Sequence, residues 1–76
     1  MEQIKKILRE LRPEFDFTSS NNFIEDGYLD SFDIVSLIAM IEENFNISID
    51  GMDIIPENFI NCEAILALVK KNGAQI

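Results

Sequence analysis

The sequence predicts a small all-α protein, a four-helix bundle of three main helices and one short helix. Two observations lead to this prediction. Apolar residues recur at helical spacing in three segments, and proline, asparagine or glycine stands at the ends of these segments. The alternation typical of a strand occurs only around Ile47 and Ile49, which is too short to make a sheet without a partner. The 76 residues are expected to form one domain, residues 1–76, with a small core.

The first predicted helix covers residues 2–12. Its apolar face carries Ile4, Ile7, Leu8 and Leu11, and its other face carries the basic residues. Pro13 should end it, because a residue before proline is disfavoured in the helical conformation.

Residues 13–30 show neither helical nor strand periodicity and are expected to form a long connection. A connection of this length needs apolar anchors to become ordered, and long ordered loops often carry function. Six residues can provide the anchors: Phe15, Phe17, Phe23, Ile24, Tyr28 and Leu29.

The second predicted helix runs from Ser31 to Phe45. A helical wheel places the core face at Ile34, Ile38, Ile41 and Phe45, with Leu37 at its flank. The opposite face mixes apolar groups with acids, which indicates a docking surface, the alternative being a helix buried on more than one side. This outer face consists of Phe32, Ser36, Ala39 and Glu43, with Asp33, Val35, Met40 and Glu42 at its margins.

The end of the chain predicts a short helix followed by the last main helix. Pro56 suits a first helical turn, and Phe59 should face inward. Asn61 is a suitable N-cap for the last helix, whose final turn carries two lysines and whose C′ position falls on Gly73.

Composition excludes several classes of function. Because the chain has no histidine, Ser-His-Asp and Cys-His catalysis and histidine-containing zinc sites are ruled out. A calcium loop starting at Asn44 fails, since isoleucine stands at its sixth and twelfth positions. The single cysteine, Cys62, is expected to pack as a small apolar side chain and fits a reducing compartment.

Charge is distributed unevenly along the chain. The formal net charge is −8, and residues 13–69 contain twelve carboxylates but no lysine or arginine. Such a surface disfavours nucleic acid and anionic lipid and favours basic patches on partner proteins. No segment has the length and apolarity of a membrane span or signal peptide, so a cytoplasmic location is expected.

Ser31, at the start of the second helix, has two interpretations. Either Ser31 or Asp30 could cap the helix by accepting hydrogen bonds from its first N–H groups. Alternatively, the same N–H groups and the positive helix end would favour a phosphate esterified to the Ser31 oxygen. Serine without a neighbouring base is a poor nucleophile, so another enzyme would have to attach that group.

The chain resembles the acyl carrier proteins over its whole length. The resemblance rests on Gly27-Tyr28-Leu29-Asp30-Ser31, a G-x-x-D-S motif, on the EENF that ends the second helix, and on the PENF before the last helix. It implies a bundle of the acyl carrier protein type. It also implies that a phosphopantetheinyl transferase, using magnesium, transfers 4′-phosphopantetheine from coenzyme A to Ser31.

The resemblance further implies a monomeric carrier without a catalytic site of its own, which presents acyl or aminoacyl thioesters to enzymes of fatty acid, polyketide or related biosynthesis. Basic patches on those enzymes would meet the second helix at Asp30, Phe32, Asp33, Val35, Ala39, Met40, Glu42 and Glu43.

Two positions depart from the pattern of fatty acid carriers. Phe32 replaces the commonest leucine, and Ser36 stands where a glutamate is frequent. The DSF sequence is similar to D-alanyl and other aminoacyl or peptidyl carriers, so the cargo stays open. An unmodified acidic adaptor and a small carboxylate hydrolase are the rival hypotheses from other classes.

Overall fold

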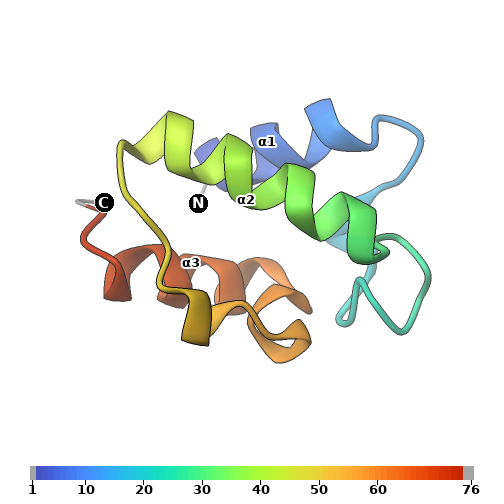
Figure 1. Ribbon diagram of the computed structural model, residues 1–76. Coiled ribbons are helices and arrows are strands. Elements are labelled where there is room, and N and C mark those ends of the chain that lie inside the picture. Colours follow the sequence, from blue (N-terminus) through green and yellow to red (C-terminus); the bar gives the residue numbers. More distant parts are fainter. Residues whose placement is uncertain (1, 75–76) are drawn as a thin grey trace.

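The computed structural model describes residues 2–74, and these residues form helices and connections without any strand (Figure 1). The three α-helices are α1 (Glu2–Leu11), α2 (Ser31–Phe45) and α3 (Cys62–Lys71). Three short 3₁₀ helices lie in the connections: η1 (Phe17–Ser19), η2 (Gly51–Asp53) and η3 (Pro56–Phe59). The predicted all-α architecture is confirmed, and η3 is the predicted short helix.

The helix ends follow from local sequence signals. Asn61 caps α3, its side chain accepting a hydrogen bond from the Ala64 N–H. At the other end of α3, Gly73 has a φ of 102°, and its N–H donates to the Lys70 carbonyl while the Ala74 N–H donates to that of Val69. This pattern is a Schellman motif, which requires the left-handed conformation that glycine adopts most easily.

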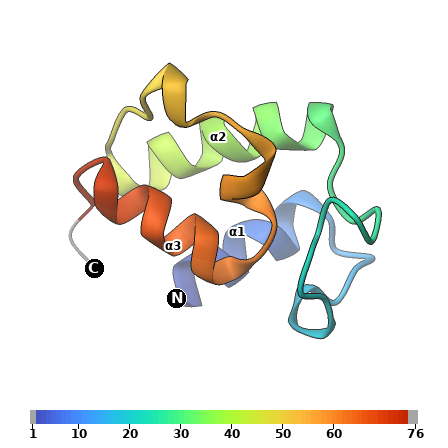
Figure 2. The ribbon, with the colours of Figure 1, turned by 90° about the horizontal axis from the view of Figure 1, so that it is seen from below.

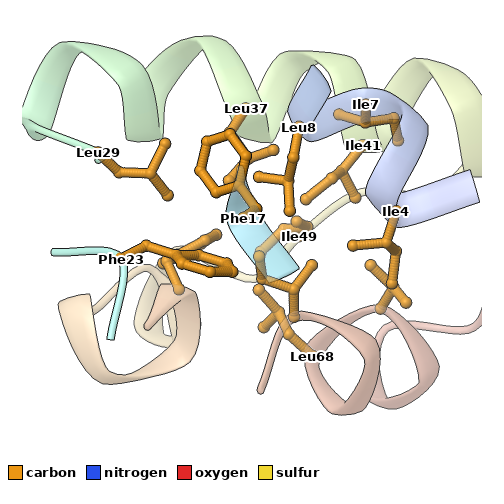
Figure 3. Packing of buried hydrophobic residues seen from close by; sticks show 13 residues of the cluster. Ile4, Ile7, Leu8, Phe17, Phe23, Leu29, Leu37, Ile41, Ile49 and Leu68 are labelled. Carbon is orange, nitrogen blue, oxygen red and sulfur yellow. The ribbon is translucent and has the colours of Figure 1, made fainter. Parts of the chain in front are cut away.

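One apolar core joins the three helices to the long connection between α1 and α2 (Figure 3). The core draws on η3 as well, through Phe59. Its buried members are Ile4, Ile7, Leu8, Phe17, Phe23, Leu29, Leu37, Ile41, Ile49, Phe59, Ile65, Leu68 and Val69. Cys62 is half-buried at the start of α3.

The predicted core face of α2 is confirmed, since all five residues lie in the core or pack against it, but its most buried part is at Leu37 and Ile41. Leu37 and Ile41 are fully buried, whereas Ile34, Ile38 and Phe45 are half-buried. The reason is the position of α1, which runs antiparallel along one side of α2 and contacts it near both ends. Gln3 donates to the Asn44 carbonyl at one end, and Arg12 contacts Asp33 at the other. The buried face is therefore turned toward Leu37 and Ile41.

The connection between α1 and α2 is anchored by aromatic packing, as predicted. The Phe17 ring meets the Phe23 ring edge to face at 4.9 Å, and Phe15 stacks on Tyr28 at 4.6 Å. Phe23 also fixes the backbone: its N–H donates to the Ile60 carbonyl, and its own carbonyl accepts from Tyr28 and Leu29. The connection is thus tied both to the core and to the segment before α3.

These contacts place the long connection and the start of α2 at one end of the molecule. Figure 2 shows the last turn of α3 at the opposite end, and Figure 1 agrees. None of the helices in residues 2–74 is long and apolar enough to cross a membrane.

Phe23→Ala is predicted to cost about 3–5 kcal/mol of unfolding free energy, because the ring is fully buried and leaves a cavity. Urea denaturation followed by circular dichroism measures this cost. Phe32→Ala is the matched control: its ring is 83% exposed, so its loss should change stability by no more than about 0.5 kcal/mol. Equal costs for both variants would contradict the packing described above.

Candidate attachment site

Ser31 is the first residue of α2 and is exposed to solvent. The helix starts there because Asp30 caps it: the Asp30 side chain accepts a hydrogen bond from the Asp33 N–H at 2.9 Å. In return, the Asp33 carboxylate accepts from the Asp30 N–H at 3.2 Å, which completes a capping box. Of the two candidate caps, Asp30 is therefore the one that is used, and the Ser31 hydroxyl is not needed for this role.

Asp33 points into the protein instead of toward solvent. It is only 8% exposed, and both of its oxygens accept hydrogen bonds from the Arg12 guanidinium at 3.0–3.1 Å. Burial alone would raise the pKa of Asp33, but the hydrogen bonds from Arg12 and from the Asp30 N–H outweigh burial and lower the pKa below its ordinary value. The pKa of Arg12 is raised, chiefly by its hydrogen bonds to Asp33 and by the negative charge of that carboxylate.

The expected exposure of Asp33 on the docking face is therefore wrong. The helical wheel placed it at the margin of the outer face, but the capping box and Arg12 hold its carboxylate inward. The positive charge of the paired arginine offsets the attraction that this carboxylate would exert on a basic partner.

The other predicted docking residues divide into two groups. Asp30, Phe32, Val35, Ala39 and Glu43 are exposed, and the side chains of Phe32 and Val35 are 83% and 68% accessible. Met40 and Glu42 are half-buried, and Glu42 is also engaged, since its carboxylate accepts a hydrogen bond from the Ile49 N–H.

We define the docking face as the exposed group: Asp30, Phe32, Val35, Ala39 and Glu43.

Sequence reasoning missed two features of the structure. The first is the pairing of Asp33 with Arg12: the spacing of Asp30 and Asp33 could have indicated the capping box, but no local pattern indicates the arginine. The second is a group of exposed apolar residues in the connection before α3, namely Met52, Ile54 and Ile55. Because these three follow no helical or strand period, the sequence pattern alone could not show which way they point.

The start of α2 can accommodate a phosphodiester on Ser31. The hydroxyl is exposed, and the N–H groups of Ser31 and Phe32 have no acceptor one turn earlier in the helix. These groups and the helix dipole favour negative charge at this point. Gly27 adopts a φ of 78° in the turn that leads to Ser31, and Leu29 is buried, so the approach to the helix is anchored as well.

Comparison with known proteins agrees with this geometry. The family model described as "Phosphopantetheine attachment site" matches residues 2–69. The chain belongs to this family. The acyl carrier protein of Buchnera aphidicola subsp. Baizongia pistaciae (strain Bp) is 38% identical to it over 71 residues, which cover 91% of this chain and 88% of that protein.

Membership of the phosphopantetheine attachment-site family confirms the predicted resemblance to acyl carrier proteins and the predicted cofactor, 4′-phosphopantetheine. Within the family, the bound arm supplies a terminal thiol that holds the cargo as a thioester, while the protein presents it.

Asp33→Asn is predicted to make stability less sensitive to acid. Because folding lowers the pKa of Asp33, its charge stabilises the protein above the unfolded aspartate pKa of about 3.9, and that stabilisation is lost as pH falls through the folded pKa. Urea titrations at a series of pH values should show the advantage of wild type over the variant shrinking below about pH 4. A difference in unfolding free energy that stays constant across this range would show that Asp33 does not titrate in this way.

Proposed function

We propose that this chain is an acyl carrier whose 4′-phosphopantetheine arm is attached to the Ser31 hydroxyl. The observation that carries the proposal is the division of roles at the start of α2. Asp30 and Asp33 perform the capping, so Ser31 stays exposed at the positive end of the helix. A serine placed in this way is accessible to a transferase, and its phosphodiester would face the first N–H groups of α2.

The chain's own residues then orient the arm and present it to partners. The capping box fixes the backbone on both sides of Ser31, and the buried Leu29 and Phe23 hold the preceding turn on the core. The carrier has no catalytic role of its own in this proposal, and the partner enzymes supply acids, bases and metals for loading and transfer. A cytoplasmic location is part of the proposal, since a single cysteine fits a reducing compartment.

The docking face supports brief contacts with basic partners. Phe32, Val35 and Ala39 offer apolar surface next to the start of α2, and Asp30 and Glu43 add negative charge at the two ends of the face. Exposed charge pairs mainly raise the association rate and restrict the choice of partner, so they allow rapid release. A phosphopantetheinyl transferase and the enzymes that load and use the cargo are the proposed partners of a monomeric, single-domain carrier.

The cargo is an acyl or an aminoacyl group. A fatty acid or polyketide pathway is favoured by the similarity to the Buchnera acyl carrier protein. A D-alanyl or peptidyl carrier is the second candidate, favoured by Phe32 and Ser36, both of which are exposed on α2.

Ser31→Ala is predicted to abolish modification. The protein is co-expressed with a promiscuous phosphopantetheinyl transferase, and the intact mass is expected to rise by one phosphopantetheine group in wild type only. Ser36→Ala is the matched control, since Ser36 is also an exposed serine of α2. A mass gain that survives Ser31→Ala would contradict the proposed site, and an unmodified wild type would support the acidic adaptor.

Glu43→Lys is predicted to slow modification several-fold at low salt, because it reverses a charge on the docking face. The rate that remains should depend less on ionic strength than that of wild type. Glu10→Lys, an equal change at an exposed position of α1, should leave the rate close to wild type. If both variants are slowed equally, net charge rather than the docking face determines the rate.

A further inference from the structure

Asp33 connects Arg12 to the backbone on both sides of Ser31. Its carboxylate accepts from Nε and Nη2 of Arg12 and also from the Asp30 N–H. The Asp33 N–H donates in turn to the Asp30 side chain. The two bonds of the capping box therefore enclose Ser31 and Phe32, and Arg12 holds the box from outside the helix.

This arrangement sets the orientation of Ser31. Asp30 lies outside the helix, in extended conformation, and Ser31 is the first helical residue, so the chain changes direction at this point. The Arg12 guanidinium reaches the Asp33 carboxylate with three hydrogen bonds in a fork, which restricts the position and the rotation of that carboxylate. A lysine in its place would keep the charge but not this planar fork.

The same contact sets the charge next to Ser31. Without Arg12, a largely buried carboxylate would stand uncompensated two residues from the serine, and Asp30 would add a second negative charge beside it. The incoming phosphate is also negative, and like charges held close together repel. Residues 13–69 contain no lysine or arginine that could compensate these charges in place of Arg12.

We propose that Arg12 is a positioning residue for the loading of Ser31, acting through Asp33; this rests on the proposed function. In the loading step the Ser31 oxygen bonds to the phosphorus that bears the pantetheine, and the pyrophosphate P–O bond of coenzyme A breaks. Adenosine 3′,5′-bisphosphate leaves with the electron pair of that bond. The hydroxyl proton passes to a base of the transferase. Arg12 touches none of the reacting atoms, and its contribution is the direction of the serine and the neutralised Asp33.

The test compares loading rates of apo-protein variants with a promiscuous transferase and coenzyme A. Arg12→Gln is expected to lower the kcat of loading about tenfold with a smaller change in KM, because the reacting oxygen is misdirected after the protein has docked. Arg9→Gln is the charge-matched control on α1, an exposed arginine that should load within about twofold of wild type. All rates are measured at a temperature where circular dichroism shows every variant to be folded.

A double variant separates positioning from a general structural role. In Arg12→Gln with Asp33→Asn, the asparagine oxygen can still accept the Asp30 N–H, and the uncompensated charge is gone. This variant should recover the part of the loading rate that Arg12→Gln loses to the uncompensated charge, and Arg12→Lys should also recover part of the rate. Loading by Arg12→Gln at the wild-type rate would overturn the proposal, as would a double variant no faster than Arg12→Gln.

Ser31→Ala in the same assay keeps this inference apart from the proposed function. If Ser31→Ala blocks loading but Arg12→Gln does not impair it, only the role of Arg12 fails. If Ser31→Ala is still loaded, the attachment site itself is wrong.

Discussion

The contact between Arg12 and Asp33 is the constraint on which the attachment end of the molecule depends. It joins the residue after α1 to the first turn of α2, and so it closes the long connection between these helices. A small domain buries a limited core, so little of its stabilising free energy is left to offset the conformational entropy lost when such a connection is ordered. Both ends of the connection are fixed, and Phe17 and Phe23 anchor its middle in the core. The connection therefore has fewer conformations open to it, and less entropy is lost when it is ordered.

The sequence was sufficient for the helices because their limits depend on local chemistry. Pro13, Asn61 and Gly73 each act on the backbone within a few residues, so their effects could be predicted without knowing the fold. The core face of α2 was predicted from its residues, but which of them are most deeply buried could not be predicted in the same way. Its helical wheel has an apolar arc wide enough for several orientations, and the orientation found depends on packing against α1, whose Ile7 and Leu8 share one core with Leu37 and Ile41.

The candidate site was predictable in its centre but not in its surroundings. The motif that ends at Ser31 indicated the serine, and the structure shows why the serine is exposed: the cap belongs to Asp30. Asp33 was misplaced because charged residues are usually exposed, and only a partner distant in sequence can make burial of one acceptable. That partner is Arg12, and no local pattern links the two residues.

The inward position of Asp33 also limits how this carrier can attract its partners. On the first turns of α2, the charge facing solvent comes from Asp30, while Phe32 and Val35 supply apolar surface. Acids elsewhere on the surface can guide a basic partner from a distance, and in the proposed docking mode the final fit beside Ser31 depends on the shape of two exposed apolar side chains. Phe32 and Val35 together leave apolar surface exposed to water next to the attachment point. Exposed apolar patches often mark sites that a partner protein covers. Selectivity among partners should therefore depend more on Phe32 than on any single acid.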